Sequence, residues 1–164
     1  EYIPGELLAR GTNVMLGYYK NEEATRQALD SEGWYHSGDL ALMDSDGYVY
    51  IKGRIKNMLL GANGQNVYPE EIEDKLNSMT LVVESLIVQK GDKLVALIYP
   101  DYEEAKNLGI SKDDLCHVME QNLIELNQLI PSYSKLTTFK LMDEEFEKTP
   151  KKSIKRYLYK DVEL

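Results

Sequence analysis

The sequence contains few of the residues that mark an exported, metal-bound or membrane-spanning protein. It has one cysteine, Cys116, in 164 residues, which excludes an internal disulfide and fits a reducing compartment. No apolar run approaches the roughly 20 residues of a membrane-spanning helix, and no signal peptide opens the chain. The two histidines, His36 and His117, lack a partner at metal-ligand spacing. We therefore expect a cytoplasmic protein with no transmembrane segment and no metal site, and peripheral membrane contact of a full-length form stays an open alternative.

Positive charge is also scarce. Lys and Arg number 19 against 28 Asp and Glu, and the net charge of −9 should repel nucleic acid. Hydrophobic residues make up 43% and charged residues 29%, the balance of a globular protein that can bury a core without disulfides. Because the chain begins without Met inside strand-like sequence, we expect it to be an excised fragment.

The first 53 residues have a β-rich pattern. Residues 6–10 read as a strand, and residues 40–52 as a hairpin with Gly47 at a positive φ in its turn. Between them, residues 21–29 read as a short helix with Asn21 as its N-cap.

The rest of the chain alternates strands and amphipathic helices. Pro69 suits the first position of a helix, and Ser111 with Asp114 forms a capping box before a long helix. The expected strands and the last short helix span these ranges: strands 55–60, 81–89, 93–99 and 138–142, and helix 153–159. The fold class is therefore α+β, a β-rich piece followed by a domain with about three strands and flanking helices. We place the boundaries at 1–53, 54–56 and 57–164.

Three segments carry residue types suited to ligand chemistry. In residues 33–40, a tight turn at 37–39 between two strands would project the carboxylate of Asp39, which can accept two hydrogen bonds from a cis-diol such as that of ribose. In residues 53–73, Arg54 can clamp a ribose or phosphate oxygen with its fork, and Gly61 and Gly64 allow a close approach of backbone. Residues 148–160 hold six basic residues and no acid.

Each segment alone has a plainer interpretation. Asp39 could simply cap its turn, because Asp and Gly dominate turns for local reasons. Residues 53–73 could be a surface loop that leads into a helix. The basic tail could be a solvated helix that pairs with nearby acids.

The order and spacing of these motifs resemble the adenylate-forming superfamily of acyl-CoA synthetases, luciferases and peptide adenylation domains. Gly5-Glu6-Leu7 and Trp34-Tyr35-His36-Ser37-Gly38-Asp39-Leu40 look like the family's Gly-Glu-Leu and Tyr/Phe-x-Thr-Gly-Asp stretches. Gly53-Arg54-Ile55-Lys56, followed by Tyr68-Pro69-Glu70-Glu71-Ile72-Glu73, is similar to its Gly-Arg hinge motif and the helix after it. The basic tail resembles the final lysine motif. Matches run from about residue 5 to 158, and the middle segment looks more like long-chain fatty acyl-CoA synthetases than like peptide adenylation domains.

The resemblance implies a role for each matching residue. Asp39 would bind the ribose hydroxyls of ATP and of the acyl-adenylate, and Arg54 the ribose or phosphate side of the same nucleotide. Lys56 would lie at the hinge about which the small domain rotates between two half-reactions. Gly61, Asn63 and Gly64 would belong to a loop that lines the pantetheine tunnel of coenzyme A. ATP, Mg²⁺ and coenzyme A are the implied cofactors and co-substrates.

One position departs from the family. The catalytic lysine of the final motif falls four residues after its Thr, which is Thr149 here, so Ser153 occupies that position. Serine cannot neutralise charge between a carboxylate and the α-phosphate. Lys152, one residue earlier, is the candidate replacement if the turn is shifted by one residue.

The leading hypothesis is an acid–thiol ligase that activates a fatty acid as acyl-AMP and transfers it to coenzyme A. The family's phosphate-binding loop and acyl pocket lie upstream, so this chain alone should be inactive and should need the missing N-terminal domain. Two alternatives stay open. Transfer could go to a carrier-protein phosphopantetheine, or the chain could be a non-enzymatic α+β interaction module whose basic tail docks a partner.

Overall fold

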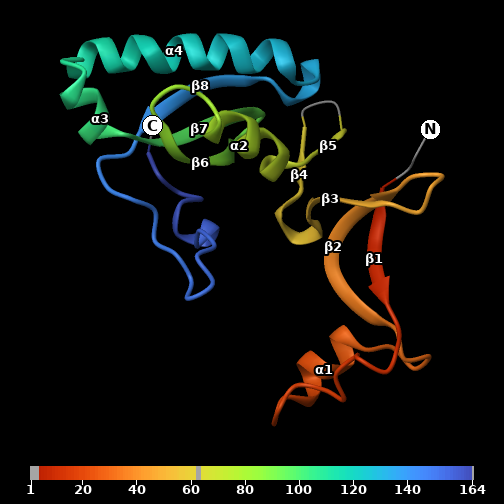
Figure 1. Ribbon diagram of the computed structural model, residues 1–164. Coiled ribbons are helices and arrows are strands. Elements are labelled where there is room, and N and C mark those ends of the chain that lie inside the picture. Colours follow the sequence, from red (N-terminus) through yellow and green to blue (C-terminus); the bar gives the residue numbers. More distant parts are fainter. Residues whose placement is uncertain (1–3, 62–63, 164) are drawn as a thin grey trace. The chain divides into compact units, whose positions relative to one another are not determined.

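The chain forms two compact units in the computed structural model, which describes residues 4–61 and 64–163. Unit 1 is Glu1–Met58 and unit 2 is Leu59–Leu164 (Figure 1). Each unit is described by itself below.

Unit 1 is a three-stranded antiparallel sheet with one short helix. Its strands lie in the order β1 (Gly5–Ala9), β2 (Tyr35–Met43) and β3 (Val49–Arg54), and α1 (Glu22–Ala28) is inserted between β1 and β2. The predicted N-cap is confirmed, since Asn21 Oδ1 accepts a hydrogen bond from Ala24 N at 3.0 Å. The predicted β2–β3 hairpin is also confirmed, with Gly47 at φ +87° in its turn.

Unit 2 is the α+β domain that the sequence predicts. Its main sheet has the order β6-β7-β8, in which β6 (Val82–Lys90) and β7 (Lys93–Pro100) are antiparallel and β8 (Leu136–Leu141) runs parallel to β7. Because parallel neighbours need a long crossover, α3 (Tyr102–Asn107) and α4 (Lys112–Leu129) lie between β7 and β8 in the chain. The helix α2 (Pro69–Asn77) follows a two-stranded ribbon of β4 (Leu59–Leu60) and β5 (Asn66–Val67).

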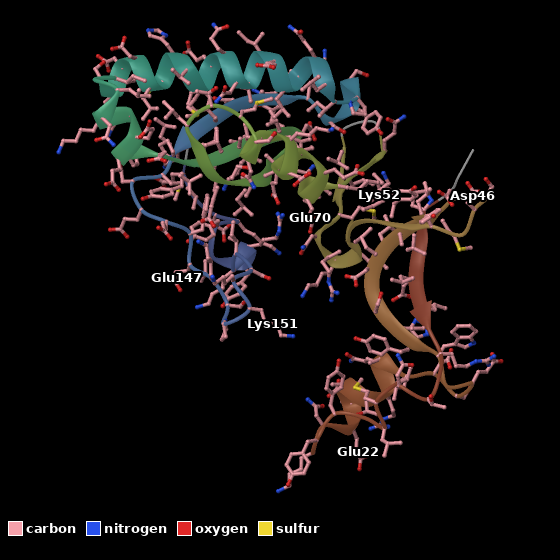
Figure 2. All side chains as sticks on the ribbon, in the orientation of Figure 1. Glu22, Asp46, Lys52, Glu70, Glu147 and Lys151 are labelled. Atoms are coloured by element: carbon pink, nitrogen blue, oxygen red, sulfur yellow. The ribbon has the colours of Figure 1, made fainter. Side chains whose placement is uncertain are left out.

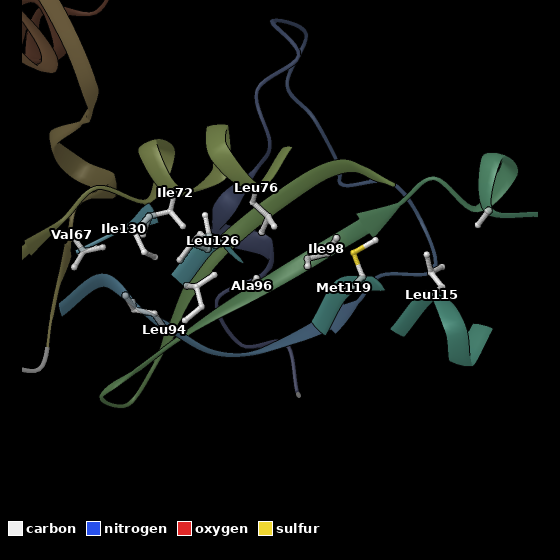
Figure 3. Packing of buried hydrophobic residues seen from close by; sticks show 13 residues of the cluster. Val67, Ile72, Leu76, Leu94, Ala96, Ile98, Leu115, Met119, Leu126 and Ile130 are labelled. Atoms are coloured by element: carbon white, nitrogen blue, oxygen red, sulfur yellow. The ribbon is translucent and has the colours of Figure 1, made fainter. Parts of the chain in front are cut away.

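Both faces of the main sheet are covered. On one face, alternate residues of β7 pack against the helices, in a core that includes Leu76 of α2 and Met119 and Leu126 of α4 (Figure 3). On the other face, Leu86, Val88, Val95 and Leu97 pack against Phe146 of the C-terminal segment. Unit 2 therefore has three layers, with the C-terminal segment as the third.

Burial differs sharply between the units. Within the described residues, Ala41, at 8% exposure, is the one buried hydrophobic residue of unit 1, whereas unit 2 holds all the others. Several side chains of unit 1 are well exposed, including Tyr19, Tyr48, Tyr50 and Ile51.

Three local expectations were wrong, and one short helix was not expected. Residues 37–39 do not form a turn between strands, because β2 continues through them with Gly38 at φ +69°. Residues 55–60 divide into a 3₁₀ helix, η1 (Ile55–Asn57), and β4. The helix expected at 153–159 is only a 3₁₀ turn, η3 (Arg156–Leu158), and the short helix α3 was missed.

Candidate functional site

Asp39 and Arg54 form an ion pair across two neighbouring strands. Their Cα atoms are register partners in the β2–β3 ladder, and Arg54 Nη1 lies 2.5 Å from Asp39 Oδ1. The side chain of Asp39 is 30% exposed and that of Arg54 is 45% exposed, so both are accessible to a ligand. In the part of the chain that the structure describes, Asp39 Oδ2 accepts no hydrogen bond, and this oxygen is available to a polar ligand.

The backbone before Asp39 is held in an unusual conformation. Arg54 Nη1 also donates to the carbonyl oxygen of Ser37 at 3.0 Å, and Ser37 Oγ accepts from Asp39 N at 3.0 Å. A Cβ atom on Gly38 would lie 3.4 Å from Arg54 Nη2, at a φ that L residues avoid. Glycine is therefore favoured at this position by its positive φ, because 3.4 Å is an ordinary contact with the end of a flexible side chain.

Glu6 and His36 belong to the same cluster, and the sequence argument gave neither of them a role. Glu6 Oε1 accepts from Gly38 N at 3.1 Å, and Glu6 Oε2 lies 2.9 Å from His36 Nδ1. The hydrogen bond to Glu6 raises the pKa of His36, with Asp30 adding to the effect and desolvation opposing it. The available sequence signal was that Glu6 and His36 each lie in a family motif. The contact itself joins residues 30 positions apart, so no local pattern predicts it.

The predicted hinge and tunnel-loop residues lie beyond β3. Lys56 is exposed in the 3₁₀ helix η1. Gly61 is buried at the end of β4, where an added Cβ would lie 3.3 Å from the carbonyl oxygen of Gln65, and Gly64 has φ +72°. Asn63 lies outside the described residues.

The final motif forms a tight hairpin. Thr149 N donates to Ser153 O and Lys152 N donates to Thr149 O, both at 2.8 Å, with Lys152 at φ +61°. This is a three-residue loop whose last residue is left-handed, a geometry that usually takes glycine. Both Lys152 and Ser153 are exposed, and Figure 2 shows Lys151 on the same hairpin.

Acidic residues of unit 2 neutralise half of the basic tail. Lys148 Nζ lies 2.6 Å from Glu84 Oε1, and Lys155 Nζ lies 3.0 Å from Glu147 Oε2. Arg156 forms an ion pair with the buried Glu73. Of the three acids only Glu147 is near in sequence, so the plainer interpretation, a helix that pairs with nearby acids, holds in part: the tail is paired, but as a hairpin and mostly with distant residues.

The described residues contain neither a cluster of metal-binding side chains nor a membrane-spanning helix. Within residues 4–61 and 64–163 no three His, Cys, Asp or Glu side chains gather in a way that would hold a metal ion. None of the helices in that part of the chain is both long and apolar enough to cross a membrane.

Comparison with known proteins defines the family. Residues 56–161 match the model of the AMP-binding enzyme C-terminal domain. The chain therefore belongs to the adenylate-forming superfamily and carries the C-terminal domain of an AMP-binding enzyme, a class whose curated relatives here are CoA ligases.

Two curated relatives and one solved structure illustrate the match. The chain is 38% identical over 120 residues to the long-chain-fatty-acid–CoA ligase FadD15 of Mycobacterium tuberculosis, covering 68% of this chain and 20% of that protein. It is 34% identical over 121 residues to a 2-succinylbenzoate–CoA ligase of Bacillus cytotoxicus, covering 74% and 24%. The adenylation domain of a carboxylate reductase from Mycobacterium chelonae shares the fold, with a TM-score of 0.86 and 22% identity over 98% of this chain and 26% of that domain's chain. This chain thus spans about a quarter or less of the length of these proteins.

Proposed function

We propose that the complete protein activates a fatty acid with ATP and transfers the acyl group to coenzyme A, and that this chain supplies the lid domain and part of the nucleotide site. The observation that carries the proposal is the Asp39–Arg54 pair, which presents a partly exposed carboxylate and guanidinium side by side across β2 and β3. It supports nucleotide binding because a carboxylate oxygen accepts from ribose hydroxyls while a guanidinium favours phosphate.

The chemistry has two steps. The substrate carboxylate attacks the α-phosphorus of ATP, forming acyl-AMP and releasing pyrophosphate. The thiol sulfur of coenzyme A then attacks the acyl carbonyl, AMP leaves, and the thiol proton passes to solvent. Asp39 would orient the ribose in both steps and Arg54 would hold Asp39 and stabilise negative charge on the nucleotide.

Mg²⁺ would enter with ATP and neutralise charge on its phosphates. The described residues provide no cluster of acidic ligands for it, so we assign it to the nucleotide and to the preceding domain. Lys56 would act as the hinge between 1–53 and 57–164, and the loop of Gly61, Asn63 and Gly64 would approach the pantetheine arm in the second step.

A fatty acid is the substrate that the match to the FadD15 ligase supports. The other curated relative has an aromatic dicarboxylate in its name, so chain length must be measured.

The loss of the family lysine at Ser153 leaves Lys152 as the candidate cation for the first step, and its position at the exposed hairpin suits a group that reaches a substrate.

The first experiment uses the full-length enzyme and acid-dependent ATP–pyrophosphate exchange. Replacing one charged hydrogen-bond partner of a ligand costs about 1.5–3 kcal/mol, so Asp39→Ala should lower kcat/KM for ATP by roughly 10-fold to 100-fold. Asp46→Ala, at an exposed turn of the same unit, is the matched control and should leave exchange unchanged. Exchange that survives Asp39→Ala at the normal rate contradicts the assigned nucleotide site.

The second experiment separates the half-reactions and the acceptors. Ser153→Lys should accelerate exchange, Lys152→Ala should slow it, and thioester formation from supplied acyl-AMP should change little in either variant. An unchanged exchange rate in Lys152→Ala rejects Lys152 as the replacement.

Coenzyme A and a phosphopantetheine-bearing carrier protein are compared as acceptors, and faster transfer to the carrier would overturn the coenzyme A assignment. The isolated chain should show no turnover.

A further inference from the structure

The Glu6 carboxylate on β1 bridges two groups on β2, just before Asp39. One oxygen accepts from the Gly38 amide at 3.1 Å and the other lies 2.9 Å from His36 Nδ1. Among the described residues of β1, Glu6 is the one whose side chain accepts a hydrogen bond from the backbone of residues 37–39.

The ladder between β1 and β2 explains why a side chain is needed there. Glu6 pairs with Leu40 and Leu8 pairs with His36. An advance of two residues along β1 therefore corresponds to an advance of four residues along β2. The residues of β2 in this interval bulge out of the ladder, which leaves the Gly38 amide without a backbone acceptor on β1. The carboxylate of Glu6 replaces that acceptor, and a charged acceptor makes a stronger bond than a carbonyl.

The bulge is thus clamped from both neighbouring strands. Glu6 on β1 holds the Gly38 N–H, and Arg54 on β3 holds the Ser37 carbonyl. Asp39 follows directly and is the partner of the same Arg54. Because the two clamps hold the C=O and the N–H of the same peptide group, the one between Ser37 and Gly38, they fix the orientation of this peptide directly before Asp39.

Further groups orient Glu6 itself. The His36 ring lies between Glu6 and Asp30, with Nε2 3.5 Å from Asp30 Oδ2. Asp30 Oδ1 in turn accepts from the backbone amides of Glu32 and Trp34, both at 2.9 Å. The two carboxylates favour the protonated ring, which raises the pKa of His36.

We propose that Glu6 is a positioning residue for the nucleotide site, holding the Gly38 bulge so that Asp39 and Arg54 are aligned before ATP arrives. The role in catalysis rests on the proposed function above, whereas the role in holding the bulge does not. The competing explanation is that Glu6 only attaches β1 to β2, which predicts a loss of stability without a specific loss of nucleotide affinity.

Glutamine separates the two contributions of Glu6. Glu6→Gln keeps an oxygen that can accept from Gly38 N–H, but it removes the negative charge next to His36. Glu6→Ala removes both. Glu23, exposed on α1 of the same unit, provides the matched control pair Glu23→Gln and Glu23→Ala.

The first measurement is NMR of this 164-residue chain. In Glu6→Ala the amide signals of Gly38 and Asp39 should move or broaden, whereas in Glu6→Gln they should stay near their wild-type positions. The pKa of His36 should fall in both variants. Unchanged Gly38 and Asp39 signals in Glu6→Ala would overturn the proposal whether or not the longer protein is a ligase.

The second measurement is the KM for ATP in pyrophosphate exchange by the full-length enzyme. Glu6→Ala should raise the KM for ATP by about 5-fold or more with a smaller change in kcat, and Glu6→Gln should recover most of the loss. Equal KM values in wild type and Glu6→Ala would reject the positioning role. If wild type itself shows no exchange with any acid, the proposed function fails, and the NMR result still decides whether Glu6 holds the bulge.

Discussion

Glu73 is a carboxylate placed almost inside the core of unit 2. It belongs to α2, its residue is 8% exposed, and its Oε1 accepts from Ile87 N on β6 at 2.7 Å. Its other oxygen pairs with Arg156 of the C-terminal segment. One side chain therefore connects a helix, a strand and the segment that carries the final motif.

The pH dependence of folding should reveal this buried group. Desolvation raises the pKa of Glu73 to about 7, although Arg156 and the Ile87 amide act in the opposite direction. Between about pH 4.5, its ordinary value, and pH 7 the folded state holds a proton that the unfolded state releases. The contribution of Glu73 to the free energy of unfolding is therefore largest below pH 4.5 and falls as the pH rises toward 7.

Glu73→Gln tests this, because glutamine keeps the acceptor for Ile87 N–H and does not titrate. Urea unfolding followed by circular dichroism between pH 4.5 and 7.5 should show a smaller loss of stability with rising pH in this variant. Glu125→Gln, at an exposed position of α4, should behave as wild type. Identical pH profiles for wild type and Glu73→Gln would mean that Arg156 keeps Glu73 ionised.

At the scale of the elements, hydrogen bonds between neighbouring residues specify where α4 begins. Ser111 Oγ accepts from Asp114 N at 3.1 Å, and Asp114 Oδ2 accepts from Ser111 N at 3.4 Å. The Ser111 hydroxyl also donates to Asp114, which holds the pKa of that carboxyl below its usual value. The cap satisfies amides that the first turn leaves unpaired.

Ser111→Ala should lower the free energy of unfolding of unit 2 by about 1 kcal/mol, the usual cost of losing an N-cap. Urea unfolding at neutral pH measures it. Ser132→Ala, at an exposed position of the 3₁₀ turn Ser132–Ser134, is the control and should stay within about 0.5 kcal/mol of wild type. A Ser111→Ala variant as stable as the control would show that the packing of α4 alone fixes its start.

The C-terminal segment contrasts with α4, because its form depends on distant partners. Residues 148–154 pair as a hairpin and are anchored by Glu84, and Phe146 packs edge-on against Tyr159 with ring centroids 5.0 Å apart. The pattern in residues 153–159 predicted a helix, but these contacts hold the segment as a hairpin followed by a 3₁₀ turn. The anchored hairpin is also what leaves Lys152 and Ser153 exposed together.

At the scale of the whole chain, the two units differ in how much apolar surface they bury. Unit 1 has Ala41 as its one buried hydrophobic residue within the described part of the chain, and unit 2 has two hydrophobic clusters. Burial of apolar area supplies most of the free energy of folding, at about 25 cal/mol per Å². Unit 1 is therefore expected to open far more readily than unit 2.

Hydrogen exchange measured by mass spectrometry tests this difference. Amides of β1–β3 should exchange at least about 10-fold faster than amides of β6 and β7 in this chain, because they can open without disturbing the core. In the complete protein as proposed above, the N-terminal domain should slow exchange in β1–β3 and leave β6 and β7 unchanged. Equal protection of both sheets in the isolated chain would show that unit 1 is stable by itself.

The sequence alone determined the features that depend on neighbouring residues and on repeating patterns. These include the caps at Asn21 and Ser111, the turn at Gly47 and the α+β class with its three-stranded main sheet. Ordered motifs also identified the superfamily, which the family comparison confirms. The nucleotide-binding roles of Asp39 and Arg54 stay predictions. The boundaries at 53 and 57, the hinge at Lys56 and the tunnel loop stay predictions.

Tertiary structure alone decided the features that join distant residues. The Glu6–Gly38 contact spans 32 positions and the Arg156–Glu73 pair spans 83, and no local pattern announces either of them. The expected turn at 37–39 became a bulge within β2 because two neighbouring strands hold it, one through Glu6 and one through Arg54. Local hydrogen bonds are encoded within a few residues, whereas a buried carboxylate or a clamped bulge exists only once the sheet has brought its partners together.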